Sequence, residues 1–422
     1  MARRSGIRRL LWILILCTGF SLTVIQAKGL IEYFRSNPTA QTIRIESRAR
    51  VEYPEITVCP GVTWNFTALK LLNVTGFSAY NSIWSDLFQE LLNISVLEAL
   101  NSYSLWDLSK IVVLCTFPIN PQNYEYYRCS PRDGYTWING SRVYETEAGY
   151  WRETRIVNWS GSNSPLKYCY TFHVKSSLRM RLSSISPVME FALSFKDSID
   201  ESGDFGEPYY EIRIDSPDEP FTAVRNVTSS GKTFFLLGER SYMLSLSLKY
   251  YEFLPSGSKC NGDEEYDYKK CLETALVEYM NEAPCIQPSV LPIKHDQAAT
   301  MRHCNTSQDQ TDFINFYDEL HEDFDPGCPR KCKRKTYNVI QLDDPDIPLR
   351  HYGMIKLNTP TAEVEIVEEH SLTSLEQFLS SIGGMVGLYL GVSLLGVYEC
   401  LEILAIWVRI RLLRAQIIRA NL

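Results

Sequence analysis

The chain has 422 residues, more than one simple domain needs and enough to bury a large core. Its net charge of −8 hides two basic ends, because residues 1–9 and 409–422 carry four arginines each and no acid; setting these eight charges aside leaves −16 for residues 10–408. The basic ends are short and adjoin apolar runs, which argues against a nucleic-acid partner.

The first apolar run extends from Leu10 to Ala27, 18 uncharged residues between Arg9 and Lys28. We predict a cytoplasmic segment over 1–9 and a first transmembrane helix over 10–32. A secretory signal peptide cleaved after Ala27 is the alternative. The run exceeds the usual apolar core of a signal peptide, about 7–15 residues, and Trp12 beside the arginines suits a retained interfacial anchor.

The region between the two apolar runs, residues 33–373, has the composition of an extracellular domain. Ten of the twelve cysteines lie between Cys59 and Cys332, an even number that predicts disulfides in an oxidising compartment. The same region contains every glycosylation sequon of the chain, at Asn65, Asn73, Asn93, Asn139, Asn158, Asn226 and Asn305.

Local patterns divide this region into segments. Alternation predicts extended chain over 33–58, and strands over 168–172, 209–214, 233–237 and 242–251. Residues 61–165 are predicted to be irregular, with helical patches over 83–100, in a finger-like insertion spanning 61–168. A thumb-like, cysteine-rich part spans 259–333, with helices predicted over 271–280 and 310–322.

Several charged runs and potential metal ligands are candidate sites. An acidic run over 309–325 is either a solvated helix face or a cluster that senses protons or cations, and the basic run 330–335 would pair with it. The spacing of Cys328 and Cys332 permits metal ligation, but disulfides explain it better. The histidines lack metal-ligand spacing, and no nucleotide loop or nucleophile elbow is present. We predict no metal, no cofactor other than a permeant sodium ion, and no enzyme.

The second apolar run includes 22 residues without a formal charge, from Gln377 to Tyr398, and continues to Val408. We predict a second transmembrane helix over 374–408 that lines a pore, followed by a cytoplasmic segment over 409–422. The glycines at 383, 387 and 391 allow close helix approach, and Ser380, Gly384, Gly391 and Glu402 fall within about 40° on a helix of about 100° per residue. Glu399 and Glu402 are costly in lipid. A dimerising anchor is the alternative.

Five motifs resemble those of the degenerin/epithelial sodium channel family, which includes the acid-sensing ion channels. They are Arg9-Leu-Leu-Trp12 entering the first helix, Tyr53-Pro-Glu-Ile-Thr-Val-Cys59, Tyr168-Cys-Tyr-Thr-Phe172 with His173 replacing the family's Asn, Ile212-Arg-Ile-Asp-Ser-Pro-Asp-Glu-Pro220, and Ser381-Ile-Gly-Gly-Met-Val-Gly-Leu-Tyr-Leu-Gly-Val-Ser393. The last match is the most specific, and together the motifs cover nearly the whole chain.

The resemblance implies a trimeric channel with two transmembrane helices per subunit and a large disulfide-rich α+β extracellular domain of palm, finger, thumb, knuckle and β-ball. It implies a selectivity filter at Gly391, Val392 and Ser393, with a gate and pore lining formed by Ser380, Ser381, Gly384, Gly387, Glu399 and Glu402. It also implies a helix break at the filter, so that Glu402 need not share a face with Gly384. The implied disulfides are Cys59–Cys169, Cys260–Cys332 and Cys271–Cys328; Cys115–Cys129 and Cys285–Cys304 are assigned to the remaining cysteines, whose pairing stays open.

The expected function is that of a ligand- or stimulus-gated, amiloride-sensitive, sodium-selective cation channel subunit in the plasma membrane, with both termini cytoplasmic. The expected partners are identical or related subunits in a trimer, membrane lipid and an extracellular ligand.

Three departures keep alternatives open: no His-Gly motif precedes the first helix, Ser381 replaces an Asp, and Gly257 replaces an aromatic residue before Cys260. The alternatives are a non-conducting regulatory subunit and a cell-surface binding receptor. The gating stimulus is not encoded in any recognised motif.

Overall fold

The structure is a computed structural model of the whole chain. It describes residues 2–61, 108–120, 125–132, 134–138, 141–157, 166–182, 187–196, 209–218, 232–255, 259–285, 302, 308–309, 312–313, 315–316, 327–343, 351–391, 398–399 and 401–411, and every structural statement below concerns these residues. The chain forms two compact units, one of residues 1–42, 256–258 and 369–422, the other of residues 43–255 and 259–368.

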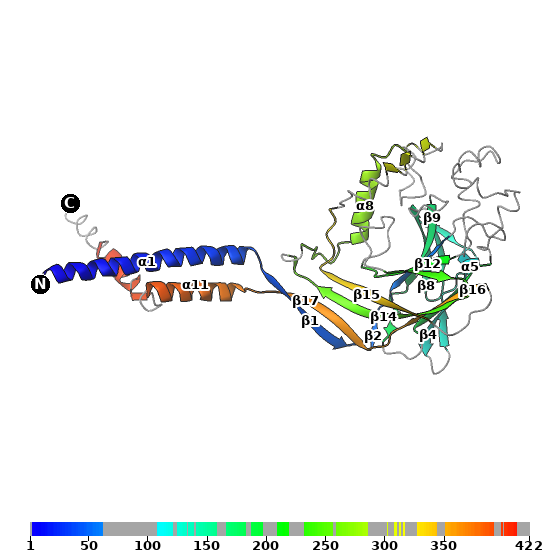
Figure 1. Cartoon of the computed structure of the whole chain (residues 1–422), viewed down its shortest axis with the longest axis horizontal. Helices are drawn as coiled ribbons and strands as arrows, with labels where there is room; N and C mark the ends of the chain where they lie inside the picture. The colour runs from blue at the N-terminus through cyan, green and yellow to red at the C-terminus, as the bar shows by residue number, and fades with distance from the viewer. Residues whose placement is uncertain are drawn as a thin grey trace. The chain divides into compact units, whose positions relative to one another are not determined.

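The first unit contains the helices α1 (Ala2–Arg35) and α11 (Leu375–Leu390), which Figure 1 shows side by side. The chain passes between the two units within β1 (Thr39–Ser47) and within β17 (Glu363–Ser371). A hydrogen bond from the Leu372 amide to the Pro38 carbonyl, 2.9 Å long, ties together the two segments that lead to the helices.

The second unit is built mainly of antiparallel strands, with two short helices. Its remaining elements are β2 (Arg50–Val51), β3 (Glu55–Pro60), α5 (Leu108–Ile111), β4 (Val112–Asn120), β5 (Glu125–Arg128), β6 (Thr136–Ile138), β7 (Ser141–Glu145), β8 (Gly149–Val157), β9 (Leu166–Val174), β10 (Met180–Arg181), β11 (Met189–Ser194), β12 (Tyr209–Asp215), β13 (Lys232–Leu237), β14 (Ser241–Glu252), α8 (Tyr268–Met280), β15 (Lys333–Asp343) and β16 (Tyr352–Asn358).

Two large sheets account for most of these strands. The first has the order β1-β17-β14-β16-β11-β4-β5, with β15 also paired to β14, and the second has the order β13-β12-β3-β9-β8-β7-β6. Strand β14 shows how the sequence specifies its place, because Leu244, Leu246 and Leu248 are buried while the alternating residues face outward. Strand β3 lies between β12 and β9 and is buried along nearly its whole length.

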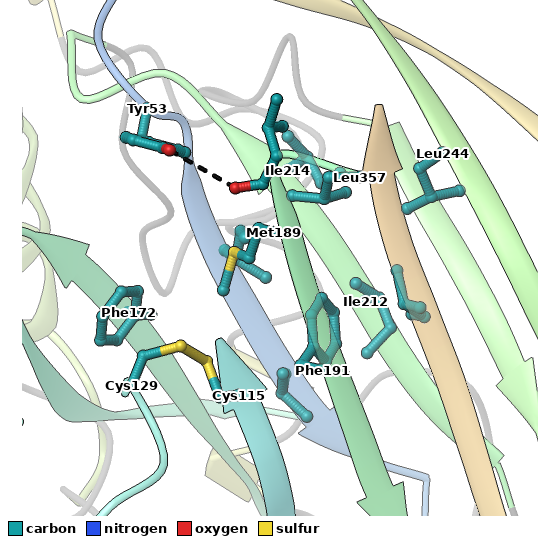
Figure 2. Packing of buried hydrophobic residues seen from close by; sticks show 14 of the residues in the cluster. Tyr53, Cys115, Cys129, Phe172, Met189, Phe191, Ile212, Ile214, Leu244 and Leu357 are labelled. Atoms are coloured by element: carbon teal, nitrogen blue, oxygen red, sulfur yellow. Dashed lines mark hydrogen bonds between the residues drawn. A yellow bond between two sulfur atoms is a disulfide. The ribbon is translucent and has the colours of Figure 1, made fainter. Parts of the chain in front are cut away.

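The hydrophobic core lies between the two sheets (Figure 2). Phe191 and Leu357 contribute from the first sheet, and Ile212 and Phe172 from the second, all with at most 1% of their surface exposed. The ring of Phe117 lies 5.6 Å from that of Phe172 and 4.9 Å from that of Tyr53. This packing is what joins the sheets into one unit.

The disulfides add covalent links. The structure contains Cys59–Cys169, Cys115–Cys129, Cys260–Cys332 and Cys271–Cys328, the pairings expected from the sequence. Cys285 is also disulfide-bonded, but its predicted partner Cys304 lies outside the described residues.

Several predicted elements are confirmed and two predictions are wrong in part, the first being that residues 33–58 are extended, since α1 continues to Arg35. Strands appear where alternation predicted them, as β9, β12, β13 and β14, and α8 covers the helix predicted over 271–280. The prediction that 61–165 is irregular fails for the described residues between 108 and 157, which include α5 and the strands β4 to β8. Their short segments are rich in aromatic residues and pair with other strands within the two sheets. This pairing stabilises them as strands although their local alternation is weak. The predicted helices over 83–100 lie outside the described residues.

Among the described residues, no helix is both long and apolar enough to cross a membrane. The transmembrane assignments of 10–32 and 374–408 stay predictions.

The buried phenol of Tyr53 makes stability depend on alkaline pH. Burial raises the pKa of Tyr53 well above its ordinary value, so the folded chain keeps this proton at a pH where the unfolded chain, with tyrosine pKa values of about 10, has lost it. The stabilisation that the Tyr53 phenol contributes is therefore fully present below a pH of about 10, and it is lost as the pH rises above that value. Removing the hydroxyl in Tyr53→Phe breaks the 3.4 Å bond to the Val188 carbonyl, at a cost of about 1 kcal/mol or less near neutral pH.

We therefore expect the melting temperature of full-length Tyr53→Phe to be slightly below that of the wild type near neutral pH, and to fall less steeply than the wild type at alkaline pH. Tyr126→Phe, at an exposed position, should follow the wild-type curve. Parallel alkaline slopes for wild type and Tyr53→Phe would contradict this account.

Candidate ion-conducting site

Helix α11 has well-defined ends. At its start, the Ser374 hydroxyl accepts a hydrogen bond from the Gln377 amide, and the Gln377 side chain accepts one from the Ser374 amide, both at 3.1 Å, which forms a capping box. At its end, Gly391 adopts a left-handed conformation with φ of 63° and ψ of 19°. The helix therefore stops at the first residue of the predicted selectivity filter, where the resemblance implies a break.

The aromatic face of α11 packs against α1. The Phe378 ring stacks on that of Phe34 with centroids 4.4 Å apart, and the Gln26 amide nitrogen donates a 3.0 Å hydrogen bond to the Tyr389 hydroxyl. Because the earlier residue of α1 pairs with the later residue of α11, the two helices run antiparallel.

At Gly19, α1 comes close to the backbone of α11. A Cβ atom added to Gly19 would lie 2.5 Å from the Tyr389 carbonyl oxygen, so this position requires glycine. One turn later Thr23 is buried, and its hydroxyl donates a 2.8 Å hydrogen bond to the Gly19 carbonyl of its own helix. The small residues that let these helices meet thus lie on α1.

The glycines Gly383 and Gly384 of α11 play no such part in the contact with α1. A Cβ added to Gly383 or Gly384 would meet nothing within 4 Å, so neither glycine is needed to accommodate α1. The pattern that identifies the actual contact was present in the first apolar run, where Gly19, Thr23 and Gln26 follow each other at helical spacing.

The small-residue face of α11 lies away from α1. At about 100° per residue, Ser380 and Gly384 are about 160° and 120° around the helix from Phe378. Ser380, Ser381, Gly384 and Gly391 are all exposed, whereas Gly387 is half-buried. One face of α11 is therefore covered by α1 and the other is left uncovered by the described part of the chain.

The remaining predicted pore residues are only partly described. Val392 and Ser393 lie outside the described residues, so the filter is represented by Gly391 alone. Glu399 and Glu402 are exposed within helical residues 398–399 and 401–411, where Arg411 lies 4.6 Å from the centre of the Trp407 ring. All seven predicted glycosylation sites also lie outside the described residues.

His173, which replaces the family's Asn, belongs to a small polar cluster in the second sheet. Its Nδ1 lies 2.8 Å from a carboxylate oxygen of Glu55, and its ring stacks on Tyr150 at 4.8 Å. Burial, followed by the charge of Glu55, raises the pKa of Tyr150 above its ordinary value. The sequence motif located His173 but not its partners, because Glu55 and Tyr150 come from neighbouring strands.

The contacts described for the basic run 330–335 are with residues outside the acidic run, and its pairing with that run stays a prediction. The Lys335 ammonium forms an ion pair with Glu52 and lies 4.0 Å from a carboxylate oxygen of Asp218, while burial lowers the pKa of Lys335. The Arg334 guanidinium lies 5.0 Å from the centre of the Tyr251 ring. In the acidic run, Asp309 forms a 2.6 Å ion pair with Arg302, and most of the other acids lie outside the described residues.

The part of the chain that the structure describes contains no group of three or more His, Cys, Asp or Glu side chains placed to hold a metal ion. The expectation that the chain binds no metal or cofactor is left as a prediction.

Comparison with known proteins places these features in a family. A comparison with curated proteins finds no match. Among solved structures, a cryo-EM structure of a proton-activated chloride channel is similar over 94% of this chain and 98% of that one, at 8% identity and a TM-score of 0.29, a likeness too weak to carry an argument. The family model described as amiloride-sensitive sodium channel matches residues 1–403. Because that match spans nearly the whole sequence, the chain belongs to the amiloride-sensitive sodium channel family, a family of ion channels.

Proposed function

We propose that the chain is a subunit of a stimulus-gated, sodium-selective, amiloride-sensitive cation channel that carries sodium passively across the plasma membrane. The proposal rests on family membership and on one observation, the division of α11 into a covered and an uncovered face. A helix that lines a pore shared by several subunits keeps its pore face free of its own chain, and α11 has such a face.

The proposed topology follows the sequence boundaries. Residues 1–9 and 409–422 are cytoplasmic, 10–32 and 374–408 cross the membrane, and 33–373 form the extracellular domain, with the finger-like 61–168 and thumb-like 259–333 parts. Three identical or related subunits surround the pore, α11 of each lies nearest the axis, and α1 lies behind it. The contacts of Phe34 and Gln26 with the aromatic face of α11 support this order of layers.

The proposed filter is formed by Gly391, Val392 and Ser393 of the three subunits. Backbone carbonyls and serine hydroxyls would replace part of the hydration shell of sodium, and the lack of a side chain at Gly391 allows three chains to approach closely. Its left-handed backbone supports a sharp change of direction there. The charge of −16 over residues 10–408 would concentrate cations near the pore mouth, within a Debye length of about 8 Å.

Ser380 tests the pore assignment. Because Ser380 lies on the uncovered face of α11, a bulky residue there is expected to prevent that face from closing against the same face of other subunits. In whole-cell recordings of the full chain, alone or with related subunits, Ser380→Trp should increase the steady amiloride-blocked sodium current several-fold.

The matched control for this experiment is Leu379→Trp, an equally large side chain at an exposed neighbouring position about 100° away on the helix. It should leave the steady current near the wild-type level. The absence of sodium current from every variant and combination would refute the conducting function, and equal activation by both substitutions would refute the pore-facing orientation of Ser380.

Gly391 tests the filter. An alanine at this left-handed position costs about 1–2 kcal/mol of backbone strain and adds a methyl group where chains are proposed to meet. We expect Gly391→Ala to lower sodium current and sodium-over-potassium selectivity, read from the reversal potential at matched surface expression. Gly383→Ala, on the regular helix, should affect selectivity less. The reverse ranking would contradict the filter assignment.

A further inference from the structure

A pocket of about 600 Å³ lies on the second unit, beside the edge of the second sheet, within the size range of sites for small ligands. Its walls come from the loop before β6, the β6–β7 pair, the turn between β7 and β8, and the residue after β9. The lining residues are Arg132, Gly134, Tyr135, Thr136, Val143, Glu145, Thr146, Glu147 and Lys175.

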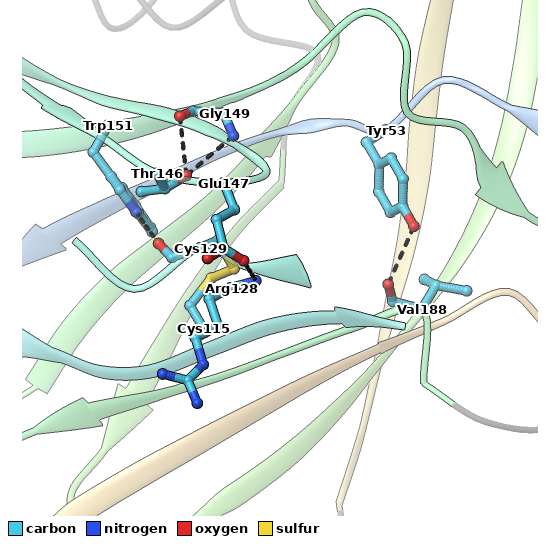
Figure 3. Close-up of a disulfide and its surroundings, with 9 residues drawn as sticks. All are labelled: Tyr53, Cys115, Arg128, Cys129, Thr146, Glu147, Gly149, Trp151 and Val188. Atoms are coloured by element: carbon cyan, nitrogen blue, oxygen red, sulfur yellow. Dashed lines mark hydrogen bonds between the residues drawn. A yellow bond between two sulfur atoms is a disulfide. The ribbon is translucent and has the colours of Figure 1, made fainter. Parts of the chain in front are cut away.

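The pocket is held in place by contacts beneath it, several of which Figure 3 shows. The Cys115–Cys129 disulfide fixes the start of the loop that leads to Arg132, and the buried Trp151 indole donates a 2.7 Å hydrogen bond to the Cys129 carbonyl. The Thr146 hydroxyl both donates to the Gly149 carbonyl and accepts from the Gly149 amide, which closes the β7–β8 turn. The walls are therefore preorganised.

Two carboxylates, those of Glu145 and Glu147, line the pocket, and that of Glu147 forms hydrogen bonds within the protein. Glu147 accepts hydrogen bonds from the Arg128 amide at 3.3 Å and from the Arg132 guanidinium at 3.2 Å. The backbone carbonyl of Glu147 accepts a 2.7 Å bond from the Lys175 ammonium. These contacts tie both Arg132 and Lys175 to Glu147, and the charge of Glu147 is paired with that of Arg132.

Two opposite charges in the pocket are not neutralised in this way. The Glu145 carboxylate and the Lys175 ammonium are both exposed, and within the described ranges neither forms an ion pair. The Lys175 ammonium uses one donor on a neutral carbonyl and keeps its charge and two further donors. Since both residues line one pocket, it presents a separated negative and positive group to solvent.

We propose that this pocket binds a small zwitterionic molecule that carries an ammonium group and a carboxylate, as amino acids and short peptides do. The ligand ammonium meets Glu145, the ligand carboxylate meets Lys175, and the half-exposed ring of Tyr135 provides an apolar wall for the connecting chain. Charged hydrogen bonds at both ends favour a ligand of one particular length. The role of this binding in gating rests on the proposed channel function; the binding itself does not.

The test uses the purified full-length protein in detergent, with its melting temperature followed against ligand concentration. The probes are glycine, β-alanine, 4-aminobutanoate and 6-aminohexanoate, which carry the same two charges at increasing separation. Butylammonium and butanoate are the single-charge controls. A ligand that binds only the folded protein raises the melting temperature.

We expect one length in the series to raise the melting temperature and neither single-charge probe to do so. Glu145→Gln and Lys175→Met should each weaken the apparent affinity by about tenfold or more, as expected for the loss of one charged hydrogen bond. The double exchange Glu145→Lys with Lys175→Glu should restore binding, because a zwitterion fits in the reversed direction. Glu125→Gln and Lys196→Met, at exposed positions outside the pocket, are the matched controls and should bind like the wild type.

The proposal is overturned if no probe in the series raises the melting temperature of the wild type at millimolar concentration. It is also overturned if the single-charge probes act as well as the zwitterions, a comparison that needs no variant to fold. Sodium current is recorded separately in cells. Ligand-dependent stabilisation without any current would refute the channel proposal and leave the pocket standing, and current without stabilisation would do the opposite.

Discussion

The contact between Gly19 and the backbone of Tyr389 determines how the helices of the first unit meet. With no side chain between them at this point, α1 comes close enough for Phe34 to stack on Phe378 and for Gln26 to reach the Tyr389 hydroxyl. A larger residue at position 19 would separate the helices and weaken both contacts together. The uncovered small-residue face of α11, on which the proposed pore depends, exists because α1 is held on the opposite side.

In the second unit, the second sheet has two faces of different chemistry. One face of the second sheet supplies Phe172 and Ile212 to the core. On the other face polar groups are buried together, including the hydroxyls of Thr57 and Thr171, 2.9 Å apart. Buried polar groups need partners in fixed positions, so this face also constrains strand register. The pocket proposed to bind a zwitterion lies beside the β6 edge of this sheet.

Much of the scaffold could be predicted from the sequence. The alternating leucines identify β14, the motifs around Cys59, Cys169 and Gly391 indicate the family, and the resemblance to that family implies three disulfide pairings. The strands β4 to β8 and β15 to β17 were not predicted. The strands β4 and β15 to β17 pair with strands distant in the sequence, whereas β5 to β8 pair with their neighbours along the chain and have only weak local alternation. The capping box at Ser374 and the stop at Gly391 are local and readable. The contact of Gly19 with the Tyr389 backbone could not be predicted, because a glycine in a helix is compatible with close packing but does not identify the segment that packs against it.

The position of β3 also has a consequence for biosynthesis. This strand appears early in the chain, yet both of its neighbours, β9 and β12, follow much later, and its disulfide bridges a sequence separation of 110 residues. During synthesis β3, a strand of six residues, therefore leaves the ribosome well before either of its partner strands exists. Such delayed pairing slows folding and leaves edges open to other chains. Maturation of this protein should accordingly depend on chaperones and on disulfide exchange until the second sheet closes around β3.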